Sequence, residues 1–317
     1  MHFDTIIQGV REYCQFLKQI EDASKLRKTI AYCFERANVP NLAEDEIKKA
    51  LSFVIVGAGP TGVEFTSELR DWLEIEGKKY YAHLLKYVTI TLIEAGNSIL
   101  MVFDKELQEE GLKRLIARES SLLSEGYINA ESTKVLLNVG VKEIDSKNIH
   151  LSNGETLSYG FCVWAAGNGP SPLVLKFIDQ LKEQVELQNK ARGRIATDEW
   201  LRVIGAKNIY SIGDCSFINN ATLPATAQVA SQQGSYLGRL FSKGFIFRSE
   251  QIPLKSSNSL EETFQNDEYL SEKVNIGSLG VKSESGFEIA KPFQFLNLGI
   301  LAYIGKLNFE IYIIYII

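Results

Sequence analysis

The spacing of apolar residues changes period several times in the first hundred residues. Apolar side chains recur at near-helical spacing over residues 9–38 without an interior proline, which predicts one long helix or two short ones. Helical spacing resumes over 44–50, and 53–56 is a short apolar run ended by glycine, as in a buried strand. A helical pattern over 61–85 and a β-branched run over 87–93 follow. The order strand, helix, strand predicts a parallel βαβ unit.

Shorter elements are expected in the rest of the chain. Asp104 can cap a helix that reaches about residue 123. Short strands are predicted at 134–139, 142–144, 148–151 and 161–165, with a turn at 152–154. A third block has predicted strands at 197–201 and 208–212 and a helix at 225–241. Residues 243–290 are rich in Ser, Glu, Lys and Asn, so we expect a loop or flexible insertion there.

Composition narrows the class of protein. The 317 residues are 45% hydrophobic and 23% charged, typical of a soluble globular chain of about two domains. A net charge of -5 leaves no basic surplus for a phosphate backbone, so no nucleic-acid partner is expected. The four cysteines and three histidines lack metal-ligand or CxxC spacing, so we expect no metal site. The N-terminus shows no targeting signal, and the apolar run 309–317 is about half the ~20 residues that span a bilayer.

One glycine-rich segment joins the first predicted strand to its helix. Gly57, Gly59 and Gly62 form a GxGxxG motif. The first glycine allows a tight turn, the second lets a pyrophosphate approach the backbone, and the third permits close helix packing. Amides at the helix N-terminus would bind the anion. This context predicts a dinucleotide site, and the alternative is a glycine turn that only packs.

Glu94 follows the second predicted strand, where such a site needs a group for the adenosine ribose. Its carboxylate would accept ribose hydroxyls and repel a 2′-phosphate, which predicts NADH over NADPH. The interval from Gly57 exceeds the usual ~20 residues, and the extended helix with the polar stretch 74–79 accounts for the difference. A solvated strand end is the alternative interpretation.

A second set of candidate residues lies in the third block. Gly213 and Asp214 end the strand predicted at 208–212, which suits the presentation of a carboxylate to a ribityl hydroxyl. The next helix sets Gln228 and Gln232 on one face at i and i+4. Taken separately, these features are also consistent with an ordinary strand-end turn and solvated glutamines.

Together these blocks resemble the type II NADH:quinone oxidoreductases, the single-subunit alternative NADH dehydrogenases that do not pump protons. The resemblance covers residues 9–241 and, more weakly, 292–305. It is carried by residues 9–18, 57–64, 163–167, 213–214, 224–234 and 301–305. It implies an α/β flavoprotein fold with two Rossmann-like dinucleotide-binding domains, hydride transfer from NADH to FAD, and electron transfer from flavin to a membrane quinone of the respiratory chain.

The resemblance also implies residue roles. Glu64 would lie where nicotinamide meets flavin, and Gln228 and Gln232 would line the quinone pocket, so these three are the catalytic candidates. Asp214 would bind FAD. The further cofactor-binding positions implied are Ala166, Gly167, Gly213, Ala227 and Gln228.

The sequence also departs from the family pattern. The family has an earlier GxGxxG motif for the FAD diphosphate, whereas the motif at Gly57 is the only one here. We expect a chain truncated at its N-terminus and atypical at its C-terminus, with an incomplete FAD domain. The expected segments are 1–50, a helical lead-in and remnant of the FAD domain; 51–168, the NADH domain; 169–242, the returning half of the FAD domain with the quinone-site helix; and 243–317, a polar insertion and membrane-contact remnant.

Two other interpretations remain open. The chain would be a non-catalytic NAD(H)-binding fragment, or a flavin-dependent reductase with a protein electron acceptor that does not need the paired glutamines. For the enzyme, the resemblance implies NADH and a ubiquinone-like quinone as partners, often a homodimer, and peripheral attachment to the mitochondrial inner membrane, or to the plasma membrane of a bacterium.

Overall fold

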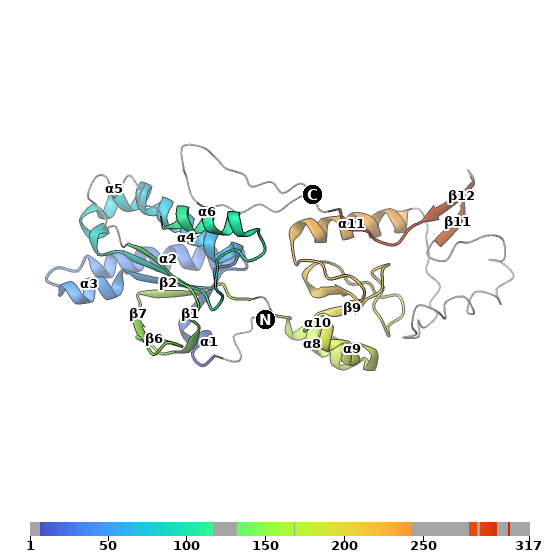
Figure 1. The fold of residues 1–317 in the computed structure, drawn as a ribbon, viewed down its shortest axis with the longest axis horizontal. Coiled ribbons are helices and arrows are strands. Elements are labelled where there is room, and N and C mark those ends of the chain that lie inside the picture. The colour runs from blue at the N-terminus through green and yellow to red at the C-terminus, as the bar shows by residue number, and fades with distance from the viewer. Residues whose placement is uncertain are drawn as a thin grey trace. The chain divides into compact units, whose positions relative to one another are not determined.

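The computed structural model describes residues 7–116, 132–167, 169–242, 279–283, 286–296 and 304, with only the backbone described over 279–283 and 286–290. The chain divides into two compact units, and each is treated by itself. One unit contains residues 2–168 and 298–317, and the other contains residues 169–297. Figure 1 shows the fold coloured along the chain.

The first unit is built on a five-stranded parallel sheet with the order β1-β8-β2-β3-β4. Its strands are β1 (Cys14–Phe16), β2 (Ser52–Val56), β3 (Thr89–Ile93), β4 (Thr133–Leu136) and β8 (Phe161–Trp164). All four residues of β8 and the last four of β2 are buried. Such near-continuous apolar strands are typical of a parallel sheet covered on both faces. Because the strands run parallel, the carboxyl ends of β2, β3 and β8 meet at one edge.

The helices of this unit are α1 (Val10–Tyr13), α2 (Ile20–Ala37), α3 (Glu44–Ala50), α4 (Pro60–Trp72), a π-helical turn (Leu73–Gly77), α5 (Lys78–Tyr81), a 3-10 turn (Ala82–Tyr87) and α6 (Lys105–Leu115). All of them except α1 pack with residues of the sheet in the larger of the unit's two cores. Phe34 of α2 is fully buried, and its ring lies 6.0 Å from that of Phe53, 5.6 Å from Trp72 and 4.7 Å from Tyr81. This aromatic cluster joins α2, α4 and α5 to the centre of the sheet.

A small antiparallel sheet contributes to the second core of this unit. Its strands are β5 (Val141–Ile144), β6 (Asn148–Leu151) and β7 (Thr156–Ser158). Buried Ile144 and Ile149 from this sheet pack in one cluster with Val54 and Val56 of β2. The two cores hold β2 in the interior of the unit, which fixes the position of the loop after it.

The second unit is smaller. Its elements are α8 (Pro172–Asp179), α9 (Lys182–Glu186), α10 (Gln188–Ala191), β9 (Ile195–Thr197), a 3-10 turn (Gly213–Cys215), β10 (Ser216–Ile218), α11 (Ala227–Ser242), β11 (Leu279–Ser283) and β12 (Gly286–Ala290). β9 pairs parallel with β10, and β11 pairs antiparallel with β12. Buried Trp200 and Leu201 pack with Leu237 and Leu240, which fixes α11 on the segment after β9.

Several local predictions differ from the structure. Residues 14–16, predicted as helix, form β1, because in-register pairing with β8 outweighs the local helical spacing. That pairing also groups residues 10–50 in one compact unit with the glycine loop, and the assignment of residues 1–50 to a lead-in and FAD-domain remnant stays a prediction. The strand predicted at 208–212 forms only an isolated bridge between Tyr210 and Arg202. The hairpin β11–β12 lies within the predicted loop 243–290, while residues 117–123 and most of the C-terminal tail lie outside the described residues.

The turn between β5 and β6 is organised by Asp145. One carboxylate oxygen lies 2.8 Å from His150 Nε2, and the other accepts hydrogen bonds from the amides of Lys147 at 2.8 Å and Asn148 at 2.9 Å. The hydrogen bond with His150, followed by the backbone amides, holds the pKa of Asp145 below its ordinary value of 3.8. A carboxylate with a lowered pKa stabilises the folded chain above its unfolded pKa and ceases to do so as the pH falls through the folded value.

We predict that Asp145→Asn reduces the acid sensitivity of the first unit. The asparagine oxygen still accepts a backbone hydrogen bond but carries no charge, so the stabilisation that wild type loses below about pH 4 is absent from the variant. Urea midpoints at pH 7 and pH 3 measure this, with Glu155→Gln, at an exposed position between β6 and β7, as the control. An equal loss on acidification in wild type and Asp145→Asn contradicts the prediction.

Candidate functional site

The loop after β2 contains three glycines. At two of them a side chain would collide with the backbone of the protein itself, whereas at the third it would not. Gly57 has φ +102°, and a Cβ there would lie 2.7 Å from the Ala166 nitrogen. At Gly62 a Cβ would lie 1.8 Å from the Gly57 oxygen. At Gly59 a Cβ would meet nothing within 4 Å. The open backbone at Gly59 is therefore accessible to a ligand, as the sequence motif predicts.

Hydrogen bonds tie this loop to the end of β3. The Gly57 amide donates to the Ile93 carbonyl at 2.8 Å. Half-buried Glu94 accepts from the Ala58 amide at 2.7 Å through Oε2 and from the Gly96 amide at 2.8 Å through Oε1. Each carboxylate oxygen has a second acceptor site, so a ribose hydroxyl can still be bound. Glu94 thus has a structural role that the sequence did not reveal, and its ribose role stays a prediction.

The end of β8 forms the other wall of the loop. The Ala165 amide donates to the Val56 carbonyl at 2.8 Å, and Trp164 Nε1 donates to the Ala166 carbonyl at 3.0 Å. Gly167 turns the chain with φ +74°. Glu64 is half-buried at the start of the second turn of α4, which begins at Pro60. The structure brings one set of predicted residues to this sheet edge: Gly57, Gly59, Gly62, Glu64, Glu94, Ala166 and Gly167.

The second predicted set lies in the other unit. Gly213 has φ +71°, and its amide donates to Oε1 of Gln233 at 2.7 Å. The Gln233 side chain is 2% exposed, whereas neighbouring Asp214 is exposed. Ala227 is the first residue of α11. Gln233 therefore fixes the turn that presents Asp214. The sequence could not indicate this hydrogen bond, because Gly213 and Gln233 are 20 positions apart.

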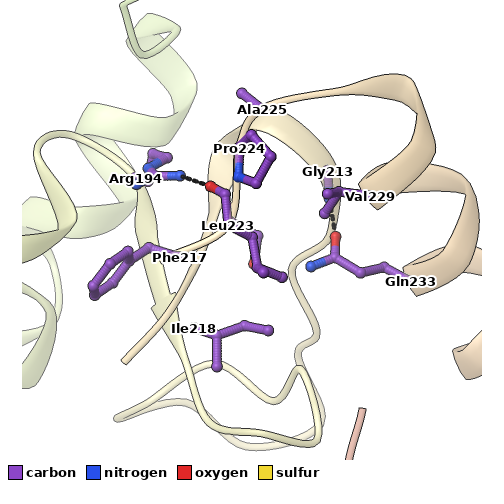
Figure 2. Close-up of a pocket in the computed structure, with 10 residues that line it drawn as sticks. Arg194, Gly213, Phe217, Ile218, Leu223, Pro224, Ala225, Val229 and Gln233 are labelled. Carbon is purple, nitrogen blue, oxygen red and sulfur yellow. Dashed lines mark hydrogen bonds between the residues drawn. The ribbon is translucent and has the colours of Figure 1, made fainter. Parts of the chain in front are cut away.

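A pocket opens beside this turn (Figure 2). Arg194 forms one side, with its guanidinium 3.4 Å from the Leu223 carbonyl and 5.3 Å from the centre of the Phe217 ring. Burial lowers the pKa of Arg194, neighbouring Arg192 lowers it further, and Asp214 raises it. Because the ordinary pKa of a guanidinium is so high, Arg194 still carries its positive charge at neutral pH. Ser216 lines the same pocket, is 6% exposed, and its hydroxyl has no hydrogen-bond partner among the described residues. The pocket combines a cation with an unsatisfied hydroxyl, which suits a ligand rich in polar atoms.

The two glutamines predicted as a pair have different environments. Gln232 Nε2 donates to the Leu296 carbonyl at 2.8 Å, and its Oε1 accepts from the Leu296 amide at 2.9 Å. Its amide thus holds the 291–296 segment against α11, which Tyr236 also contacts through a 2.9 Å hydrogen bond to the Lys291 carbonyl. Gln228 is half-buried and makes no comparable pair of hydrogen bonds among the described residues. The quinone role of both glutamines stays a prediction.

Two further properties concern only the described residues. No group of three or more His, Cys, Asp or Glu side chains is arranged there as a metal site. None of the helices in that part of the chain combines the length and apolar content needed to cross a membrane.

Comparisons with known proteins show which family this architecture matches. Residues 2–234 match the pyridine nucleotide-disulphide oxidoreductase family. A probable mitochondrial NADH-ubiquinone oxidoreductase of Schizosaccharomyces pombe is 33% identical over 94% of this chain and 51% of its own length. A mitochondrial external alternative NAD(P)H-ubiquinone oxidoreductase of Arabidopsis thaliana is 41% identical over 67% of this chain and 34% of its own length. The chain thus spans about half or less of the length of these relatives.

Solved structures agree on the fold. NDH2 from Plasmodium falciparum, determined in complex with NADH, superposes with a TM-score of 0.71 at 24% identity. The match covers 95% of this chain and 65% of that one. The predicted α/β fold of Rossmann-like flavoproteins is confirmed.

We predict that alanine at two glycines of the loop affects different properties, stability in one variant and NADH binding in the other. In Gly62→Ala the methyl group collides with the Gly57 carbonyl, so the free energy of unfolding falls by about 1–3 kcal/mol. In Gly59→Ala the methyl group enters open space, so stability changes by less than about 0.5 kcal/mol while NADH binding weakens, because the methyl group lies on the path of the pyrophosphate. Urea unfolding and calorimetric titration measure the two quantities. Normal NADH binding by a stable Gly59→Ala chain contradicts this site.

Proposed function

Since this chain belongs to the pyridine nucleotide-disulphide oxidoreductase family, we propose that it acts as a type II NADH:quinone oxidoreductase, which transfers electrons from NADH to a ubiquinone-like acceptor without pumping protons. The observation that carries the proposal is the loop after β2, whose open glycine lies beside a carboxylate at the end of β3. The names of the relatives support the same reaction.

NADH binding would use the first unit. The backbone at Gly59 and the amides at the N-terminus of α4 would bind the pyrophosphate, since these amides are not all used within the helix. Glu94 would accept the adenosine ribose hydroxyls, and its charge would repel a 2′-phosphate. Glu64, at the start of the second turn of α4, would lie toward the nicotinamide. Ala166 and Gly167 would cover the nucleotide from the end of β8.

FAD binding would use the second unit, whose residues fit part of that cofactor. Exposed Asp214 would accept ribityl hydroxyls, and the unpartnered Ser216 hydroxyl and Arg194 offer further polar contacts in the adjacent pocket. Ala227 and Gln228 begin the helix beside it. FAD would supply the two-electron chemistry that connects NADH to the quinone. The protein groups would orient the ligands, and Gln233 would keep Gly213 and Asp214 in place.

The quinone site is proposed on the face of α11 that carries Gln228 and Gln232. Gln232 is hydrogen-bonded in both directions to Leu296, so it would shape the site through residues 291–296. Gln228 would contact the quinone directly. Leu296, 63% exposed, adds an apolar surface for the ring or tail of the quinone.

The cellular setting follows from the same proposal. The relatives carry mitochondrial names. We place the enzyme on the surface of the mitochondrial inner membrane, as a peripheral protein of the respiratory chain, where a membrane quinone is accessible. A homodimer is part of the proposal.

A second candidate function is NAD(H) binding without turnover. It is favoured by the single GxGxxG motif in the sequence, because a complete FAD site in this fold would use a second glycine loop. The two functions differ in one measurable property, the retention of a flavin that NADH reduces.

The experiment that tests the proposal is a flavin titration. The purified chain is reconstituted with FAD, desalted, and treated with NADH under nitrogen, and the flavin absorbance is followed before a short-chain quinone is added. Retained flavin, bleached by NADH and restored by quinone, is the expected result. NADH binding without retained flavin favours the second function.

We predict that Asp214→Asn weakens FAD retention, because the amide accepts ribityl hydroxyls less strongly than the carboxylate does. A roughly tenfold rise in the FAD dissociation constant is expected, equivalent to about 1.4 kcal/mol. Exposed Asp179→Asn in the same unit is the matched control and should bind FAD as wild type does. Equal FAD binding by Asp214→Asn and wild type removes Asp214 from the flavin site.

We predict that Glu94→Gln relaxes the preference for NADH over NADPH. The glutamine oxygen can still accept from the Ala58 amide, but the charge that repels a 2′-phosphate is lost. The ratio of the NADPH to the NADH dissociation constant should fall about tenfold or more. Glu68→Gln, an equal charge change on the exposed side of α4, should leave the ratio unchanged. An unaltered ratio in Glu94→Gln places the carboxylate away from the 2′ position.

A further inference from the structure

Two buried cysteines that are far apart in the sequence lie opposite each other in the sheet. Cys14 of β1 is the in-register partner of Cys162 of β8. Their exposed fractions are 6% and 0%, and both belong to the core cluster between the two sheets of the first unit. The sequence has no CxxC motif, so this pair exists only because β1 joins the sheet.

The geometry of the pair fits a disulfide bond. Neighbouring strands lie about 4.8 Å apart, so in-register residues have a Cα separation within the ~4.4–6.8 Å range of disulfides. Side chains of in-register neighbours point to the same face of a sheet. The neighbouring Cys14 thiol, together with burial, raises the pKa of the Cys162 thiol.

The location of the pair provides a route for an oxidant. β1 is an edge strand of only three residues and pairs with a single neighbour, β8. Short edge strands open locally at a lower free energy than the centre of a sheet. Opening of β1 would expose Cys14 to an oxidant, while Cys162 stays fixed on β8.

We propose that Cys14 and Cys162 form a reversible redox site, in which a hydroperoxide oxidises the pair to a disulfide that links β1 to β8. The Cys14 thiolate attacks the peroxide, the O–O bond breaks, and hydroxide or alkoxide leaves and takes up a proton, so that Cys14 becomes a sulfenic acid. The Cys162 sulfur then attacks this sulfur, the S–S bond forms, and water leaves. Two thiols lose two electrons in total, and the peroxide gains them.

The disulfide would form next to the nucleotide loop. β8 ends at Trp164, and the following residues pack against Gly57, where a Cβ would lie 2.7 Å from the Ala166 nitrogen. Because β1 is a three-residue edge strand, its local opening would give thiols access to the cross-link and allow its reduction. The site is therefore suited to reversible oxidation and differs from a permanent structural disulfide.

The test is thiol mapping of the whole folded chain. The protein is treated with hydrogen peroxide, the oxidant is removed, the chain is unfolded in an alkylating agent, and peptides are analysed by mass spectrometry. The expected result is joint loss of alkylation at Cys14 and Cys162, a linked peptide pair, and an intact mass lower by two hydrogens. Dithiothreitol should restore both thiols.

Two controls make the result specific. Cys162→Ala should abolish the two-hydrogen loss, and buried Cys33, with no cysteine neighbour among the described residues, should stay alkylated. Circular dichroism before and after oxidation checks that the chain remains folded. Full alkylation of Cys14 and Cys162 under conditions that oxidise half-exposed Cys215 overturns the proposal, as does a link that forms only in urea.

Discussion

The contact between Glu94 and the backbone of the glycine loop is the constraint on which the first unit depends. At 2.7 Å it joins the Ala58 amide, just after β2, to the carboxylate at the end of β3. The central strands, buried between two cores, fix both ends of this contact. The loop is thereby held in a shape that leaves the backbone at Gly59 open. A preorganised anion site of this kind loses little conformational entropy on binding.

The second unit holds its candidate residues by a different means. A buried glutamine, Gln233, accepts the Gly213 amide and sets the turn that exposes Asp214. Another glutamine, Gln232, uses its amide as a backbone mimic and fixes the segment that ends at Leu296. Hydrogen bonds from buried or partly buried glutamines thus position the second site, whereas a continuous sheet positions the first. Substitution of either glutamine should alter the local site before it alters the whole unit.

The main features of the fold and of the first site could be predicted from the sequence, because they depend on local signals. Period changes located β2, α4 and β3, and the glycine spacing located the loop with Glu94 at the next strand end. Strand β1 was missed because its three residues are strand only through pairing with β8, a partner almost 150 residues away. The contacts of Gln233 and the meeting of Cys14 with Cys162 were missed for the same reason, since each depends on tertiary pairing. The hairpin β11–β12 lay within a polar stretch whose composition favoured a loop.

The central claim is that the loop after β2 and Glu94 form a dinucleotide site in this chain. Calorimetric titration of the folded chain with NADH, and separately with ADP-ribose, tests it most directly, because ADP-ribose contains the pyrophosphate and adenosine ribose without the nicotinamide. The account predicts that each ligand binds at a single site per chain and that each competes with the other. A folded chain that binds neither ligand would contradict it.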